Sequence, residues 1–198
     1  MQRTTTRRRR EFQRFITRNR RLFPLAGLFL VGVAGGVAVY TAADGRIPAA
    51  LMTLSPVPAG GWWQALGSSC FSSVLWLGAL FLLGLWGCGA PFILAVPLIH
   101  GWGLGLTEAY YYSHGWGGVA IAAAAVMPVG LLTAGVLIAA GVQSLRMSVD
   151  ICHRLLGDPA EDHRRGFRLY CLRYLLFLAA ALVVSLLDVL IRGVLLPQ

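Results

Sequence analysis

Few residues of this chain are of a type that could carry out chemistry, and they lie far apart. His100 sits in an apolar stretch, Glu108 follows eight residues later, and His114 follows six residues after that. An ionisable side chain in an apolar segment is a candidate for proton transfer or for binding a polar partner. No HExxH pattern or pair of aspartates accompanies these residues, which disfavours an intramembrane protease. We therefore favour a neutral His100 that hydrogen-bonds to a neighbouring helix or faces a subunit partner over a catalytic pair of His100 and Glu108.

Two further kinds of site are disfavoured by residue spacing. No pair of cysteines has CxxC spacing and no histidine lies at zinc-like spacing from them, so we expect neither a metal site nor a disulfide framework. The cysteines are Cys70, Cys88, Cys152 and Cys171. The segment Gly101-Trp102-Gly103-Leu104-Gly105 is glycine-rich but apolar, which predicts helix packing rather than a phosphate-binding loop. The sequence thus predicts no enzyme and no cofactor.

The basic residues are concentrated at the N-terminus. All 17 are arginines, and nine lie in the first 21 residues, including Arg7, Arg8, Arg9, Arg10, Arg20 and Arg21. Beside an apolar segment, such a run sets membrane topology and binds anionic lipid, so we expect no nucleic-acid partner. Near the other end, Asp188 and Arg192 have the i, i+4 spacing of an ion pair on a helix surface, with a partner contact as the alternative.

Composition places the elements that carry these residues in a membrane. The chain has 198 residues, of which 57% are hydrophobic and only 13% charged, and its mean hydropathy is +0.69. A soluble domain carries about 25% charged residues. These values exclude an ordinary soluble enzyme. They predict an all-α fold, a polytopic bundle of about five transmembrane helices.

The predicted spans are residues 22–40, 71–88, 91–106, 116–141 and 169–191. The first follows the basic tail of residues 1–21 and contains a GxxxG pair, Gly32 and Gly36, which favours close helix packing. It is longer than a signal-peptide core of about 7–15 residues, so we expect a retained anchor, with a cleaved signal peptide as the alternative. The third is short and interrupted by Pro97 and three glycines, which predicts a kinked or partly unwound helix. Pro128 lies near the middle of the fourth.

Arginines in the predicted loops give the orientation. Residues 142–168 hold five arginines, whereas the loops at 41–67 and 107–115 hold only Arg46. Because arginine-rich segments stay in the cytoplasm, we expect a cytoplasmic N-terminus and an outer C-terminus. Loop 107–115 and the following Trp116 would then form a polar, aromatic mouth on the outer side. Its residues are Glu108, Tyr110, Tyr111, Tyr112 and His114.

The middle of the chain resembles the stage II sporulation protein M family. Gly84-Leu85-Trp86-Gly87-Cys88-Gly89-Ala90-Pro91-Phe92-Ile93-Leu94 leads into His100-Gly101-Trp102-Gly103-Leu104-Gly105. His114-Gly115-Trp116-Gly117-Gly118 and then Met127-Pro128 follow. Family members resemble this chain in size, basic N-terminal tail and about five spans. The resemblance is best over residues 71–147, and the chain departs from the family at His100, where lysine is common.

The resemblance implies a role in engulfment during endospore formation. Members act with two peptidoglycan-degrading partners, the stage II sporulation proteins D and P, and hold the complex at the septal membrane without being hydrolases themselves. We therefore expect a scaffold in the bacterial cytoplasmic membrane, which could form a homo-oligomer. The alternative is the membrane component of a transporter paired with an ATPase. The candidate partner-binding or packing residues are His100, Gly101, Gly103, Gly105, Glu108, Tyr110, Tyr111, Tyr112 and Pro128.

Overall fold

The fold is a bundle of helices, as the sequence predicts. The computed structural model describes residues 22–44, 62–155 and 163–195. Within these ranges five helical segments are long and apolar enough to cross a membrane. The elements are α2 (Leu22–Ala42), α3 (Trp62–Leu85), α4 (Ala90–Ser113), α5 (Gly115–Ile121), the π-helix η2 (Ala122–Val126), α6 (Met127–Leu155) and α7 (His163–Leu195). The expectation of an all-α polytopic bundle is confirmed.

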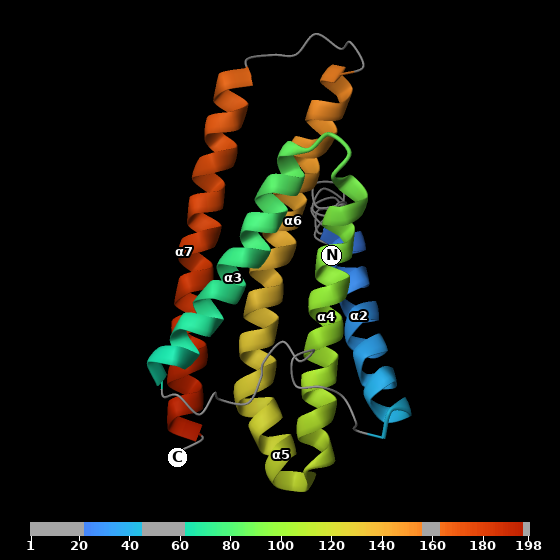
Figure 1. The fold of residues 1–198 in the computed structure, drawn as a ribbon, viewed down its shortest axis with the longest axis vertical. Coiled ribbons are helices and arrows are strands. Elements are labelled where there is room, and N and C mark those ends of the chain that lie inside the picture. Colours follow the sequence, from blue (N-terminus) through green and yellow to red (C-terminus); the bar gives the residue numbers. More distant parts are fainter. Residues whose placement is uncertain (1–21, 45–61, 156–162, 196–198) are drawn as a thin grey trace, which may run out of the picture.

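Successive spans run in opposite directions along the bundle. Figure 1 shows α4 beside α2, α6 in the middle, and α3 crossing obliquely in front of α6 toward α7. The α3–α4 turn, the end of α6 and the start of α7 lie at the same end of the bundle, which we call the arginine end. It carries Arg146 and Arg168, and α2, which follows Arg21 directly in the sequence, starts on the side of the bundle nearer this end. The α4–α5 turn and the end of α7 lie at the opposite end.

Helices α2 and α4 are held together by reciprocal glycine contacts. A Cβ atom on Gly32 or Gly36 would overlap the carbonyl oxygens of Leu98 and Trp102 on α4. In return, a Cβ on Gly101 or Gly105 would overlap carbonyl oxygens of α2. Each helix therefore presses its backbone into the gap that the other's glycines leave. In a membrane the lipid is as apolar as the helices, so their association depends on the van der Waals packing that such close backbone approach allows.

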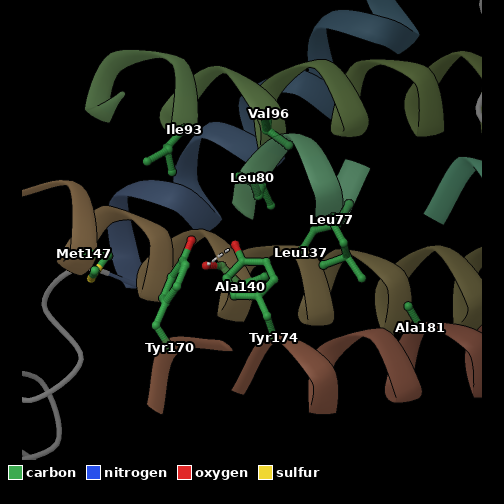
Figure 2. Packing of buried hydrophobic residues seen from close by; sticks show 10 residues of the cluster. All are labelled: Leu77, Leu80, Ile93, Val96, Leu137, Ala140, Met147, Tyr170, Tyr174 and Ala181. Carbon is green, nitrogen blue, oxygen red and sulfur yellow. Dashed lines mark hydrogen bonds between the residues drawn. The ribbon is translucent and has the colours of Figure 1, made fainter. Parts of the chain in front are cut away.

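Helices α3, α6 and α7 pack around a second core, near the arginine end. Figure 2 shows Tyr170 and Tyr174 rising from α7 toward Ala140 on α6. The hydroxyl of Tyr170 donates to the carbonyl oxygen of Phe81 on α3 at 3.0 Å, and Ser144 on α6 is hydrogen-bonded to Tyr174. The three helices thus share one buried polar knot inside an apolar cluster, which fixes their relative register.

The third span is not unwound, and most of the loop predicted after it is helical. Residues 91–106 were expected to be kinked or partly unwound, and residues 107–115 to form a loop, but α4 is one helix from Ala90 to Ser113. A kink in α4 stays a prediction. Pro97 lies in the eighth position of α4, where a proline removes the hydrogen bond to the carbonyl four residues earlier and its ring crowds that carbonyl, yet the helix continues. The glycines serve the contact with α2 instead of breaking the helix. Thr107, Glu108 and the three tyrosines therefore lie on a helix, not in a solvated loop.

The other predicted loops are also shorter than expected. Part of the loop at 142–168 is helical, because α6 continues to Leu155 and α7 begins at His163. Part of the loop at 41–67 is helical as well, since α3 begins at Trp62. These extensions are polar at the helix ends, so hydropathy alone places them outside the spans. Residues 45–61 lie outside the described residues.

The glycine contact predicts a large difference between two substitutions on α2. Gly36→Val would drive a side chain into the α4 backbone and should cost roughly 1–3 kcal/mol of unfolding free energy. Gly27→Val is the matched control, because nothing lies within 4 Å of its Cβ position and the change in helix propensity is the same. Thermal unfolding of the purified variants in detergent measures both. Equal unfolding midpoints would contradict the glycine contact.

Orientation in the membrane remains a prediction, and the turn between α3 and α4 offers a test. Cys88 is exposed in this turn at the arginine end, so a cytoplasmic arginine end hides it from impermeant reagents. In a variant whose only cysteine is Cys88, a membrane-permeant maleimide should label intact cells and an impermeant one should not. With all native cysteines removed, Trp116→Cys should be labelled by both. If the impermeant maleimide labels Cys88 in intact cells, the arginine end faces outward and the predicted orientation is wrong.

Candidate functional site

His100 is enclosed between three helices. It is only 5% exposed on α4 and its ring lies 6.5 Å from Phe29 of α2 and 6.3 Å from Trp76 of α3, measured between ring centroids. Its Nδ1 atom is buried and has no hydrogen-bond partner among the described residues. Among the described residues Nδ1 therefore makes no hydrogen bond to a neighbouring helix, and the rings in contact with His100 are those of Phe29 and Trp76.

Glu108 is placed away from His100 rather than beside it. Because α4 is unbroken, eight residues separate the two by about 12 Å along the helix axis. The two side chains therefore do not form one compact site. Glu108 is 8% exposed, and the adjacent Thr107 is fully buried with its hydroxyl donating to the carbonyl oxygen of Gly103 at 2.9 Å. Gly103 is buried on the same helix.

The turn between α4 and α5 forms a defined aromatic corner. We use this name for Tyr110, Tyr111, Tyr112, His114 and Trp116. The ring of His114 lies 4.6 Å from that of Tyr110, and its Nδ1 donates to the Tyr110 carbonyl at 2.8 Å. That bond satisfies one of the carbonyls that α4 leaves open at its end.

A hydrogen-bond relay ties the corner to α2. The Ser113 hydroxyl donates to the Tyr110 carbonyl at 2.7 Å and lies 3.1 Å from the hydroxyl of Tyr40 at the end of α2. Since the Ser113 proton goes to the carbonyl, Tyr40 is the donor in the second bond. The chain then reverses at Gly115, whose φ of +77° only glycine adopts readily. The corner is thus fixed from two sides.

The corner presents aromatic surface outward. Trp116 is 90% exposed and Tyr112 is 43% exposed, whereas Tyr110 and Tyr111 are half-buried against the bundle. On the same end of the molecule, Trp63 at the start of α3 is also exposed. Tyrosine and tryptophan offer large contact area at low entropic cost, so such a surface suits either the membrane interface or a protein partner.

Pro128 follows a local change in helix type. The segment Ala122–Val126 is a π-helix between α5 and α6, and Pro128 lies two residues after it. A proline cannot donate to the carbonyl four residues earlier and its ring collides with that carbonyl, so a widened turn relieves the conflict. Helix α5, the π-helix η2 and most of α6 therefore form one span, Gly115–Cys152, despite the proline.

A polar seam between α3 and α7 was missed in the sequence. Ser69 donates to the Asp188 carboxylate at 3.3 Å, and the hydroxyls of Ser73 and Ser185 lie 3.2 Å apart. Asp188 is 4% exposed, so it is buried rather than on a helix surface, while its ion pair with Arg192 stays a prediction because that side chain lies outside the described residues. The signal was present, because Ser69 and Ser73 are four residues apart in an apolar segment and face one side of a helix.

The remaining sequence candidates have simpler outcomes. Arg7, Arg8, Arg9, Arg10, Arg20 and Arg21 lie outside the described residues, as does the side chain of Arg192. Gly101 and Gly105 lie against α2 as described above. Across the ranges that the structure describes, no three His, Cys, Asp or Glu side chains form a group that could hold a metal ion.

These features define the class of the protein. It is a multi-pass helical membrane protein whose spans pack through glycines and small polar side chains. A family model described as Stage II sporulation protein M matches residues 25–187, which include parts of all five spans. The chain belongs to the stage II sporulation protein M family, and this membership supports a sporulation-related membrane protein. No curated protein and no solved structure matched the chain.

The turn at the corner yields a prediction with opposite signs at two neighbouring glycines. Gly115→Ala places a Cβ on a left-handed backbone and should cost about 1–2 kcal/mol of stability. Gly117→Ala adds a methyl group to an exposed position in α5 with no atom within 4 Å, and should be neutral or gain up to about 1 kcal/mol. Thermal unfolding of the purified proteins in detergent checks both. Equal stability of the two variants would contradict the positive φ at Gly115.

Proposed function

We propose that this protein is a non-enzymatic membrane scaffold that localises and anchors peptidoglycan-degrading partners during engulfment in endospore formation. Its partners on this proposal are the stage II sporulation proteins D and P, and its site of action is the septal or engulfing membrane. The observation that carries the proposal is the family match over residues 25–187. The scaffold role itself follows from the resemblance described above.

The aromatic corner supports the proposal as a partner-binding surface. Its backbone is fixed by the Ser113 relay and by the His114 contact with Tyr110. Trp116 and Tyr112 then project from a rigid support. Aromatic side chains on a preorganised support dominate binding energy at protein interfaces, because little entropy is lost when they are covered.

The predicted orientation places this corner on the side where a peptidoglycan-degrading partner works. With the arginine end in the cytoplasm, the α4–α5 turn and the start of α3 face outward. Peptidoglycan lies outside the cytoplasmic membrane, so contacts with its hydrolases lie there or within the spans. The corner is the described outer surface that combines exposure with a fixed backbone.

The second function considered was the membrane component of a transporter paired with an ATPase. Its main support was a broken third span, since discontinuous helices often line substrate paths. Helix α4 is continuous from Ala90 to Ser113, so that support is lost. The π-helix at Ala122–Val126 interrupts the fourth span only by widening it. We therefore retain the scaffold as the proposed function.

The proposal predicts that the corner's aromatic side chains recruit the partners. Replacing Tyr110, Tyr111 and Tyr112 together with alanine should reduce the fraction of fluorescent partner hydrolase at the septum by roughly tenfold, since the loss of one interface hot spot of about 2 kcal/mol weakens binding about thirtyfold. Fluorescence microscopy of sporulating cells measures this fraction. The protein level of each variant is measured in the same cells.

Trp86→Ala provides the matched control. Trp86 is also an exposed aromatic residue, 56% exposed, but it lies at the arginine end and stacks on Phe92. Its loss should leave recruitment unchanged. If the triple variant accumulates normally and recruits the hydrolase as well as the unaltered protein does, the corner is not the binding surface.

A further inference from the structure

A hydrogen bond between polar side chains joins α6 and α7 at the exposed edge of their contact, near the arginine end. Arg173 of α7 is exposed, and its guanidinium donates to the side-chain oxygen of Gln143 on α6 at 3.0 Å. The residues next to these two in the sequence, Tyr174 and Ser144, are hydrogen-bonded to each other in the buried knot. The knot therefore fixes the level at which Arg173 and Gln143 meet.

Two independent measures place this pair at the boundary of the hydrocarbon. The apolar segment of α7 is Gly166–Ile191, and its part after Arg173, residues 174–191, is about 27 Å long, which alone is close to the roughly 30 Å thickness of the bilayer core. On the other side of the bundle, a Cβ on Gly141 would contact Leu25, which lies within the first turn of α2. Gln143, two residues beyond Gly141, is thus level with the start of the first span.

The contact with Gln143 fixes Arg173 at this level but occupies only part of its hydrogen-bonding capacity. A guanidinium carries five N–H donors, and Gln143 accepts from one of its nitrogens. Within the described residues no carboxylate forms an ion pair with Arg173. A guanidinium that is fixed by one hydrogen bond and keeps other N–H donors is suited to bidentate binding of phosphate oxygens.

The neighbouring charges favour an anion at the same place. Arg146 is exposed on α6, three residues after Gln143 and about 60° further around the helix, on the side that faces away from the core. Asp150 is exposed one turn beyond Arg146, further from the membrane. Arg168 is exposed on α7 but lies about 140° around that helix from Arg173. The pair of arginines beside Gln143 thus has an excess of positive charge at the level of the lipid headgroups.

We propose that Arg173, Gln143 and Arg146 form a binding site for the phosphate group of an anionic phospholipid at the α6–α7 edge. Because the site lies at the hydrocarbon boundary, a lipid headgroup reaches it without leaving the bilayer. Its residues belong to α6 and α7 and not to the basic N-terminal tail. It does not depend on the scaffold function, since it needs only the bundle and the membrane.

The test is retention of lipid by the purified full-length protein. In native mass spectrometry with equal amounts of phosphatidylglycerol and phosphatidylcholine, the protein should retain phosphatidylglycerol preferentially. Arg173→Gln and, separately, Arg146→Gln should each lower that retention roughly fivefold, the factor expected for one arginine at an anionic surface. Asp150→Asn should raise it, because it removes the nearby negative charge.

Arg168→Gln is the matched control, since it removes the same charge from the same helix on a different face. Its retention should stay within about twofold of the unaltered protein, because Arg168 lies five residues before Arg173 and on another face of α7, where screening weakens its attraction for the same phosphate. Equal losses for Arg168→Gln and Arg173→Gln would overturn the site in favour of general attraction to the basic end.

A competition experiment distinguishes a phospholipid from free phosphate. Inorganic phosphate in excess should not displace the bound phosphatidylglycerol. Displacement would overturn the assignment to a phospholipid and leave free phosphate as the ligand. Thermal unfolding of each variant shows whether it is folded, and the Arg146→Gln result decides the proposal if Arg173→Gln is not.

Discussion

The close contact between α2 and α4 is the constraint on which the rest of the structure depends. In lipid there is no hydrophobic gain from bringing two apolar helices together, so shape and backbone proximity must supply the attraction. Gly32 and Gly36 receive carbonyl groups of α4, and Gly101 and Gly105 receive those of α2. One side chain at any of these positions would push the helices apart. The glycines therefore determine how α4 can be placed in the bundle.

Several other features follow from that placement. With α4 against α2, His100 comes to lie under the ring of Phe29, and Ser113 comes within hydrogen-bond distance of Tyr40. The second contact fixes the end of α4, and the chain reverses directly after it at Gly115. The aromatic corner is thus built on the glycine contact, although it begins at the end of α4 while Gly101 lies in the middle of that helix. The α3–α7 half is held differently, by serine, tyrosine and aspartate hydrogen bonds.

The sequence predicted the number and nature of the spans because these depend on composition, which is local. It predicted the use of Gly32 and Gly36 for the same reason, since a GxxxG pair needs only a facing helix. It was wrong about an unwound third span, because Pro97 and the three glycines break helices in water, whereas in a membrane neighbouring helices and local adjustments satisfy the backbone groups that they free. The aromatic corner could be named but not its rigidity, which depends on Tyr40, 73 residues away from Ser113. The α3–α7 seam joins residues more than 110 positions apart, and no local pattern pairs them.

The central claim is that the outer end of this bundle anchors cell-wall hydrolases, and crosslinking from that end tests it most directly. A photo-crosslinking amino acid at Trp116, the most exposed of the corner residues, would be activated in sporulating cells, and the captured proteins identified by mass spectrometry after affinity purification. The account predicts capture of peptidoglycan-degrading proteins at Trp116 and not at Arg146 at the arginine end. Capture of a transport ATPase at Arg146, with no hydrolase at Trp116, would contradict it and assign the protein to transport.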